Sequence, residues 1–232
     1  MINMKIQLHK ALCKSLLAKL PQDIGIAKKL QEKGSEAVLR NYSSQHHPTI
    51  VAGADVSVKG EHANAAIAVF DIKHMKLLEV ATARMKVDFP YIPGLLAFRE
   101  IPALSEAFGK LGTTPEVTLV DGHGLCHPRR FGLACHFGVA FDMPTIGVGK
   151  SRLIGQGDEP GLAKGAWTGL ADKGETVGRI LRTREGVKPV YISIGHRMDL
   201  DHSTSIVMDS LTGYRLPEPI RTAHKAAGEL NL

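Results

Sequence analysis

The sequence has few cysteines, few aromatic residues and no long apolar run. Its three cysteines, Cys13, Cys126 and Cys135, are a sparse and odd set, which argues against a disulfide framework and is typical of a reducing compartment. No apolar segment reaches the length that spans a bilayer. Residues 1–20 lack the continuous apolar region and cleavage site of a signal peptide. We therefore expect a cytoplasmic protein that does not enter a membrane.

Acidic residues are outnumbered by basic ones, 23 to 29, which gives a formal net charge of +6 and a pI near 9.2. A moderate basic excess is compatible with a polyanionic partner but does not identify one. Hydrophobic residues make up 44% of the chain, enough for a sizeable core, and no segment has a disordered composition. We expect one domain over residues 1–232, with an N-terminal helical region over residues 1–42.

A strand–helix–strand pattern in the middle of the chain carries two charged residues. A short apolar run at Val117–Val120 predicts a buried strand that ends at Asp121. Residues 131–141 have the apolar spacing of a helix, and a second apolar run over residues 145–149 ends at Lys150. This order predicts two parallel strands. Each would place a charged residue at its carboxyl end, where open α/β sheets bind ligands.

Three apolar strands precede this pattern. They cover residues 50–58, 63–72 and 77–87, and their short polar connections predict an antiparallel meander. A helix is expected over residues 95–109, with Pro102 kinking or dividing it. Three antiparallel strands followed by alternating helices and parallel strands are typical of an RNase H-like α/β fold, a mixed sheet flanked by helices. In that fold the first strand lies beside the fourth.

The expected pairing of the first and fourth strands makes two acidic residues neighbours. Asp55 lies within the first strand, where an acid is costly to bury unless it is paired or bound to a metal. Asp121 ends the fourth strand, and two close carboxylates repel each other unless a cation lies between them. Glu100, on the intervening helix, is a third candidate. Oxygen ligands of this kind suit magnesium or manganese, although any one of these acids taken alone is more often a solvated surface group.

The flanking segments predict further helices and strands. Asp23 is a candidate N-cap for a helix that runs to about residue 40, within which Gly34 is a candidate interruption. The triplet His202-Ser203-Thr204 is a candidate cap of a short helix. The other expected elements are helices over residues 8–20 and 220–230 and strands over residues 176–183 and 190–195.

A group of cysteines and histidines near the middle of the chain raises zinc as an alternative metal. The group consists of His123, Cys126, His127, Cys135 and His136. Its spacing matches none of the usual zinc-binding patterns, and adjacent residues on a helix point in different directions. We therefore interpret the two cysteines as small apolar packing residues.

The segment Phe89-Pro90-Tyr91-Ile92-Pro93-Gly94 is unusual because two prolines restrict the backbone around an aromatic and an aliphatic side chain. A stiff loop of this kind is suited to insert between nucleic-acid bases. The same pattern is equally typical of a rigid strand-to-helix turn with Tyr91 packed on the core. Both interpretations stay open at this point.

Several motifs resemble the endonuclease V family, the deoxyinosine 3′-endonucleases. They are GADVSV, FPYIPGLLAFREIPAL, VDGHGLCHPRRFGLACHFG, PTIGVGKSRL, GRILRTR, PVYISIGHR and PIRTAH. They occur in the family's order and cover most of residues 50–224. The resemblance implies an RNase H-like fold and a magnesium-dependent DNA repair enzyme that recognises deoxyinosine. Cleavage is expected at the second phosphodiester bond 3′ to the lesion, leaving 3′-hydroxyl and 5′-phosphate ends, with Mn²⁺ expected to substitute for Mg²⁺.

The resemblance also assigns expected roles to individual residues. It makes Asp55, Glu100 and Asp121 metal-binding acids, and Lys150 and His224 supporting active-site groups. It makes Tyr91 the side chain that separates the lesion from its partner. The residues expected to contact DNA or the flipped base are Pro90, Tyr91, Ile92, Pro93, Gly94, Leu96, Gly122 and His127.

The expected partner is DNA that contains deoxyinosine, and inosine in RNA stays open as a second substrate. We expect a monomer. An alternative enzyme is another RNase H-like nuclease, such as a flap or junction endonuclease, which would be indifferent to the base at the cut site. An alternative of another class is a repair module that binds nucleic acid without chemistry, and the loss of a metal-binding acid would indicate it. The sequence retains all three acids.

Overall fold

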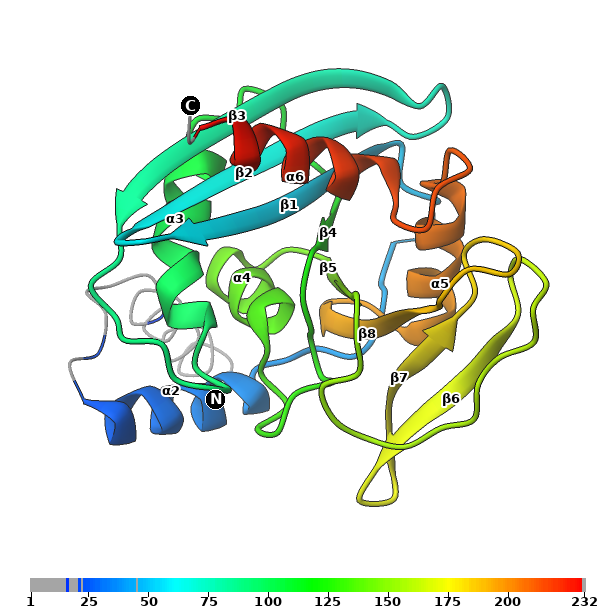
Figure 1. The fold of residues 1–232 in the computed structure, drawn as a ribbon, viewed down its shortest axis with the longest axis horizontal. Helices are drawn as coiled ribbons and strands as arrows, with labels where there is room; N and C mark the ends of the chain where they lie inside the picture. The colour runs from blue at the N-terminus through cyan, green and yellow to red at the C-terminus, as the bar shows by residue number, and fades with distance from the viewer. Residues whose placement is uncertain (1–15, 17–20, 22, 45, 231–232) are drawn as a thin grey trace.

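The computed structural model describes residues 16, 21, 23–44 and 46–230, so the helix expected over residues 8–20 lies outside the described part of the chain except for Leu16. The described residues form a mixed sheet of eight strands with helices packed against it (Figure 1). The strand order is β3-β2-β1-β4-β5-β8-β7-β6. No described helix is long and apolar enough to cross a bilayer.

The first half of the sheet has the predicted topology. β1 (Ile50–Lys59), β2 (His62–Asp71) and β3 (Lys76–Lys86) are antiparallel neighbours. β4 (Val117–Val120) runs parallel to β1, and β5 (Thr145–Gly149) runs parallel to β4. The predicted pairing of the first and fourth strands is therefore confirmed, and with it the RNase H-like order.

The second half of the sheet contains one strand that the sequence did not predict. β8 (Val190–His196) pairs antiparallel with β5, and β7 (Glu175–Leu181) pairs antiparallel with β8. Both were expected, whereas the edge strand β6 (Trp167–Asp172) was not. Only Leu170 of β6 is fully buried, so the strand lacks the alternation of apolar and polar residues by which a half-buried strand is recognised.

Helices cover both faces of the sheet. They are α3 (Ala97–Gly109) and α4 (Leu133–Phe141) on one face, and α5 (Leu200–Asp209) and α6 (Glu218–Glu229) on the other. Alternate residues of β2 show the division, because Ile67 packs with α3 whereas Ala68 packs with α6. α3 runs without interruption through Pro102, so the expectation that this proline would divide the helix is wrong.

Helix α2 (Ile24–Glu36) begins as predicted but ends earlier. The Asp23 side chain accepts a hydrogen bond from the backbone N–H of Ile26 and caps the helix. Gly34 does not interrupt α2, contrary to the expectation. A side chain at this position would place its Cβ 2.4 Å from the Phe131 ring, so the glycine is needed for close packing. In Figure 1, α2 lies at the lower left, below α3 and α4.

The cap of α5 also differs from the prediction. Asp199 caps the helix, because its side chain accepts from the backbone N–H of His202 at 2.9 Å. The triplet His202-Ser203-Thr204 therefore lies inside the first turns of α5, and its assignment as a cap is wrong. Aspartate is as favourable as serine at an N-cap, and the backbone of Asp199 has the extended conformation that this position requires.

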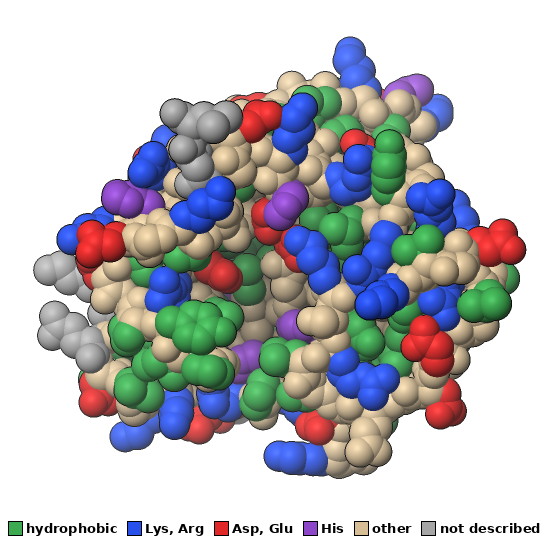
Figure 2. All heavy atoms as spheres, viewed as in Figure 1, with side chains coloured by type: hydrophobic (Ala, Val, Ile, Leu, Met, Phe, Trp, Pro, Cys, Tyr) green, Lys and Arg blue, Asp and Glu red, His purple; other side chains and the backbone are tan. Residues whose placement is uncertain are grey.

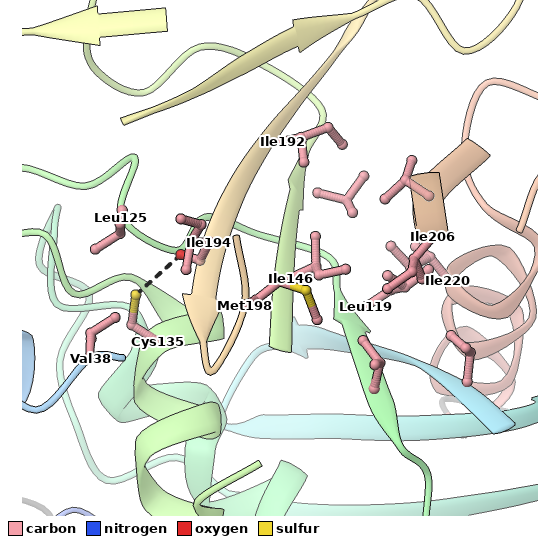
Figure 3. Close-up of a cluster of buried hydrophobic side chains, with 14 of the residues drawn as sticks. Val38, Leu119, Leu125, Cys135, Ile146, Ile192, Ile194, Met198, Ile206 and Ile220 are labelled. Carbon is pink, nitrogen blue, oxygen red and sulfur yellow. Dashed lines mark hydrogen bonds between the residues drawn. The ribbon is translucent and has the colours of Figure 1, made fainter. Parts of the chain in front are cut away.

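A large apolar cluster fixes the ends of the central strands (Figure 3). Leu119 of β4 and Ile146 of β5 point toward Ile206 of α5 and Ile220 of α6, and all four side chains are fully buried. Each side chain of this size contributes on the order of 1.5–3 kcal/mol by its removal from water. The cluster therefore holds β4 and β5 in register, and the charged residues that follow these strands are held with them.

Candidate active site

Asp55 lies in the middle of β1, where its side chain is buried and is held by a histidine from the C-terminal helix. Nδ1 of His224 lies 2.8 Å from Oδ2 of Asp55. The two elements come this close because Gly53 lacks a side chain. A Cβ at position 53 would lie 2.0 Å from the carbonyl carbon of Pro219, at the start of α6. Gly53 therefore lets the first turn of α6 rest on β1, which places His224 beside Asp55.

Asp121 is brought beside Asp55 by the parallel pairing of β1 and β4. Its backbone N–H donates to the carbonyl oxygen of Ala54 at 2.9 Å, so the pairing continues one residue past the end of β4. Lys150, directly after β5, places its Nζ 2.5 Å from Oδ2 of Asp121. Both strand-end charges are thus adjacent, as the sequence predicts for parallel neighbours.

Glu100 on α3 completes a group of three acids whose charges affect one another. Burial, followed by the charges of Asp55 and Asp121, raises the pKa of Glu100 to about 8. Burial, followed by the charge of Asp55, raises the pKa of Asp121 to about 6, although the hydrogen bond and charge of Lys150 act in the opposite direction. The free protein therefore holds Glu100 and Asp121 in an environment that disfavours their ionised forms.

The donor atoms of Asp55, Asp121 and His224 lie within 4.8 Å of one another. No other group of three such side chains in the described ranges converges in this way. Two carboxylates and an imidazole suit a divalent cation. Such a cation would offset the repulsion between acids that, after burial, contributes to the two raised pKa values. The residues present therefore fit a metal ion. His224 belongs to this group of donors, whereas the family resemblance made Glu100 the third metal-binding acid and gave His224 a supporting role.

The cysteine–histidine group does not form a metal site among the described residues. Cys126 and Cys135 are free and buried, and the Cys135 thiol donates to the carbonyl oxygen of Ile194 at 3.6 Å (Figure 3). Burial raises the pKa of the Cys126 thiol to about 12. A thiol of this kind stays protonated and does not bind zinc readily, which agrees with the interpretation of both cysteines as packing residues.

The segment between β3 and α3 forms a tight turn that presents Tyr91 to solvent. The backbone N–H of Leu95 donates to the carbonyl oxygen of Ile92 at 2.9 Å. Gly94 has a φ of 78°, which a type II turn requires at its third residue, and Pro93 occupies the preferred second position. Tyr91 is 70% exposed, so the interpretation that packs it on the core is wrong.

The carbonyl oxygen of Gly94 joins this loop to His127, another candidate lesion-binding residue. Nε2 of His127 lies 3.1 Å from Gly94 O, and the backbone N–H of Arg129 donates to Nδ1. Nδ1 is therefore the acceptor, and Nε2 carries the proton that binds Gly94. Burial, followed by the charge of Arg129, lowers the pKa of His127 to about 4, so the ring is neutral at pH 7.

The other two candidate lesion-binding residues lie at element ends. Leu96 directly precedes α3, and Gly122 directly follows Asp121. Both are half-buried. On the face that Figure 2 shows, acidic and histidine side chains border a hollow near the centre, and lysine and arginine side chains gather to its right.

Sequence reasoning missed two residues that position the site. Gly53 is one, and no pattern in the sequence reveals that the start of α6 at Pro219 rests on it. Gln31 is the other: it is buried in α2 together with Ala27 and Gly34. Its helical spacing from those two residues is a signal for the buried face, but a polar residue there is usually exposed.

Comparison with known proteins agrees with this geometry. The family model for endonuclease V matches residues 28–225. The endonuclease V of Roseiflexus castenholzii is 44% identical over 209 residues, which are 90% of this chain and 94% of the relative.

Solved structures show the same likeness. The crystal structure of endonuclease V from Streptomyces avermitilis has a TM-score of 0.88 and 38% identity, covering 92% of this chain and 95% of that one. Endonuclease V of Ciona intestinalis, in complex with a 24mer DNA containing an inosine followed by a ribo-adenosine, has a TM-score of 0.77 and 30% identity, covering 90% of this chain and 99% of that one. The chain belongs to the endonuclease V family.

Proposed function

We propose that the protein is a magnesium-dependent endonuclease that repairs DNA containing deoxyinosine, the deamination product of deoxyadenosine. It hydrolyses the second phosphodiester bond 3′ to the lesion and leaves 3′-hydroxyl and 5′-phosphate ends. The observation that carries the proposal is the convergence of Asp55, Asp121 and His224 on one point, in a chain whose family includes a member bound to inosine-containing DNA.

Asp55, Asp121 and His224 would hold the metal, and Glu100 adds negative charge from α3. A bound magnesium ion supplies an activated water and stabilises the charge that develops on the leaving oxygen. Oxygen-rich ligands favour magnesium, and manganese accepts the same ligands and is expected to substitute.

Lys150 and His224 act on the groups around the scissile phosphate. The Lys150 side chain is 40% exposed while it pairs with Asp121, so its ammonium group can reach a phosphate oxygen and neutralise its charge. His224 contacts Oδ2 of Asp55 and so fixes the orientation of that carboxylate.

Tyr91 and the loop around it would recognise the lesion. The exposed ring inserts where the flipped base leaves the stack, and Pro90, Ile92 and Pro93 keep the loop stiff. The flipped hypoxanthine would then enter a pocket of backbone donors and acceptors lined by Gly94, Leu96, Gly122 and His127. Hypoxanthine lacks the exocyclic amine of adenine and pairs weakly, which lowers the energy needed to flip it.

The chain is expected to act as a single domain over residues 1–232 and as a monomer in the cytoplasm. Its two described cysteines are free, which agrees with a reducing compartment.

The proposal is tested by incubating the protein with an end-labelled duplex that contains one deoxyinosine, with and without Mg²⁺, and mapping the nick. Matched duplexes carry deoxyadenosine, or inosine in an RNA strand, at the same position. We expect a Mg²⁺-dependent nick at the second phosphodiester bond 3′ to deoxyinosine. Equal cutting of the deoxyadenosine duplex would instead favour an RNase H-like nuclease that is indifferent to the base, and the RNA arm shows whether inosine in RNA is also cut.

A further inference from the structure

The carbonyl oxygen of Gly94, in the turn that presents Tyr91, faces three hydrogen-bond donors from two other segments. Nε2 of Gln31 donates at 3.0 Å, Nη2 of Arg129 at 2.5 Å and Nε2 of His127 at 3.1 Å. A carbonyl oxygen has two lone pairs, so three donors restrict its direction more than a usual pair would. The other side of the same peptide is also held, because the N–H of Leu95 donates to Ile92.

Gln31 hydrogen-bonds both to Gly94 and to Arg129, which is a second donor to Gly94. Its amide nitrogen also donates to the carbonyl oxygen of Phe131 at 3.3 Å, and its Oε1 accepts from Nε of Arg129 at 2.6 Å. Gln31 is 1% exposed, and each polar atom of its side chain has a partner. A buried amide that is fully paired is expensive to displace, so this side chain fixes Arg129 and Gly94 together.

Helix α2 packs against the same loop through apolar contacts. Ala27 lies in one buried cluster with Phe89, Leu95 and Phe98, which flank the turn on both sides. One turn beyond Gln31, Gly34 lies against Phe131. The helix therefore contacts both the turn before α3 and the loop before α4. Gln31 lies between these contacts and donates hydrogen bonds to Gly94 in the turn and to Phe131 in the loop.

We propose that Gln31 is a positioning residue for lesion recognition: through the Gly94 carbonyl, α2 braces the Pro93-Gly94 turn and thereby fixes the direction in which Tyr91 projects. The inference rests on the proposed function, since it concerns the step in which Tyr91 replaces the flipped base. Gln31 itself does not touch the substrate. Gln31 is distant in sequence from the turn, because it lies 63 positions before Gly94.

The test compares Gln31→Met with wild type. Methionine keeps the length and volume of the side chain but removes all three hydrogen bonds. We expect affinity for a deoxyinosine duplex to fall about threefold to tenfold, less than the loss from removing the stacking ring itself. The single-turnover cleavage rate at saturating enzyme should stay within about twofold of wild type, because the metal-binding group lies on other elements. Fluorescence of 2-aminopurine placed beside the lesion should fall in parallel with affinity.

A double-mutant cycle with Tyr91→Ala separates positioning from general stability. If Gln31 acts through the loop, Gln31→Met has less than about a twofold further effect on lesion affinity once Tyr91 is alanine. Asp23→Ala is the matched control, because it removes the cap of the same helix without touching the network. It should lower the melting temperature and leave lesion affinity unchanged.

Two results would overturn the inference: wild-type lesion affinity in folded Gln31→Met, or effects of Gln31→Met and Tyr91→Ala that multiply fully. If Gln31→Met does not fold, Gln31→Glu replaces it, since glutamate keeps the acceptor for Arg129 but cannot donate to Gly94. A wild-type protein that neither prefers nor cuts the deoxyinosine duplex would instead contradict the proposed function, which makes the two failures distinguishable.

Discussion

His224 and Asp55 are 169 residues apart in sequence, yet Nδ1 of the histidine lies 2.8 Å from Oδ2 of the aspartate. The contact joins α6 to β1, and the side chain of Asp121, which follows β4, lies at the same point. Most of the catalytic account depends on this meeting of β1, β4 and α6.

Replacement of Lys150 is expected to slow cleavage more than it weakens binding. Lys150→Met removes the ammonium group that lies beside Asp121, and the loss of one charge-stabilising group costs on the order of 100-fold in rate. Affinity for the lesion duplex should change little, because many phosphate contacts share it. Single-turnover rates and equilibrium binding on the same preparation measure both quantities.

His224→Ala should act in the same direction as Lys150→Met, and Lys225→Ala is the matched control. Lys225 is the next residue of α6 and its side chain is 80% exposed. A His224→Ala variant with the cleavage rate of wild type would show that this histidine is a surface residue of α6 without a role in cleavage.

Metal affinity should rise with pH between about 6 and 8. The pKa of Asp121 is raised to about 6 and that of Glu100 to about 8. Ligation by Asp121 requires its deprotonated form, and the negative charge of deprotonated Glu100 nearby favours the bound cation. The metal-free protein should show the opposite trend. Its folded state binds protons that the unfolded state has released, so stability falls as pH rises through these raised values.

Melting temperatures at pH 6, 7, 8 and 9, with and without Mg²⁺, measure both trends. The increase in melting temperature caused by Mg²⁺ should grow with pH. An increase that is the same at pH 6 and pH 9 would show that these acids do not take part in metal binding.

Acid should destabilise the fold through His136. This side chain is fully buried against Phe98 and Phe131, and burial lowers its pKa to about 4. In the unfolded chain histidine has a pKa of about 6.5, so the unfolded state binds the extra proton and stability is lost as pH falls from about 6.5 to about 4. The loss from this one group is on the order of 3 kcal/mol.

His136→Phe tests this source of acid sensitivity, because it keeps an aromatic ring and removes the titrating group. Urea titrations at pH 4 and pH 7 give the unfolding free energy of wild type and of the variant. Between pH 7 and pH 4 wild type should lose more of this free energy than the variant does. A difference that does not change with pH would rule out His136 as the cause.

Tyr91 should contribute to lesion affinity through its ring and not through its hydroxyl. Tyr91→Ala is expected to weaken binding of a deoxyinosine duplex by about tenfold or more, since stacking on a base is worth about 1–3 kcal/mol. Tyr91→Phe should be nearly silent. Because the side chain is 70% exposed, neither change should lower the melting temperature by much, and cleavage at saturating enzyme should persist at a reduced rate. An alanine variant with wild-type affinity would exclude the insertion of this ring.

The sequence predicted the β-sheet around the site because its apolar runs are strong and its order is restrictive. Three strands with short connections and two strands joined by a helix allow few topologies, and these place Asp55 beside Asp121. The edge strand β6 was missed because it buries only Leu170 completely, so its pattern carries little signal.

The sequence could not predict two kinds of long-range contact. One kind depends on a glycine that lets another segment come close, and the other depends on a buried polar side chain. Gly53 and Gly34 permit close approach to Pro219 and Phe131, but a glycine in a strand or helix does not identify its neighbour. His224 was found through its motif, and only the structure places it among the ligand atoms. Gln31 was overlooked because its partners, Gly94 and Arg129, are backbone and side-chain groups far along the chain.

The most direct measurement of the central claim is the nicking rate of a deoxyinosine duplex as a function of Mg²⁺ concentration, for wild type and for Asp55→Asn. The variant keeps the shape of the side chain and removes the charge from the metal-binding group. Wild type should be inactive without Mg²⁺ and reach a plateau as Mg²⁺ increases, whereas folded Asp55→Asn should bind the lesion and leave it uncut at every concentration. Full Mg²⁺-dependent nicking by Asp55→Asn would contradict the account.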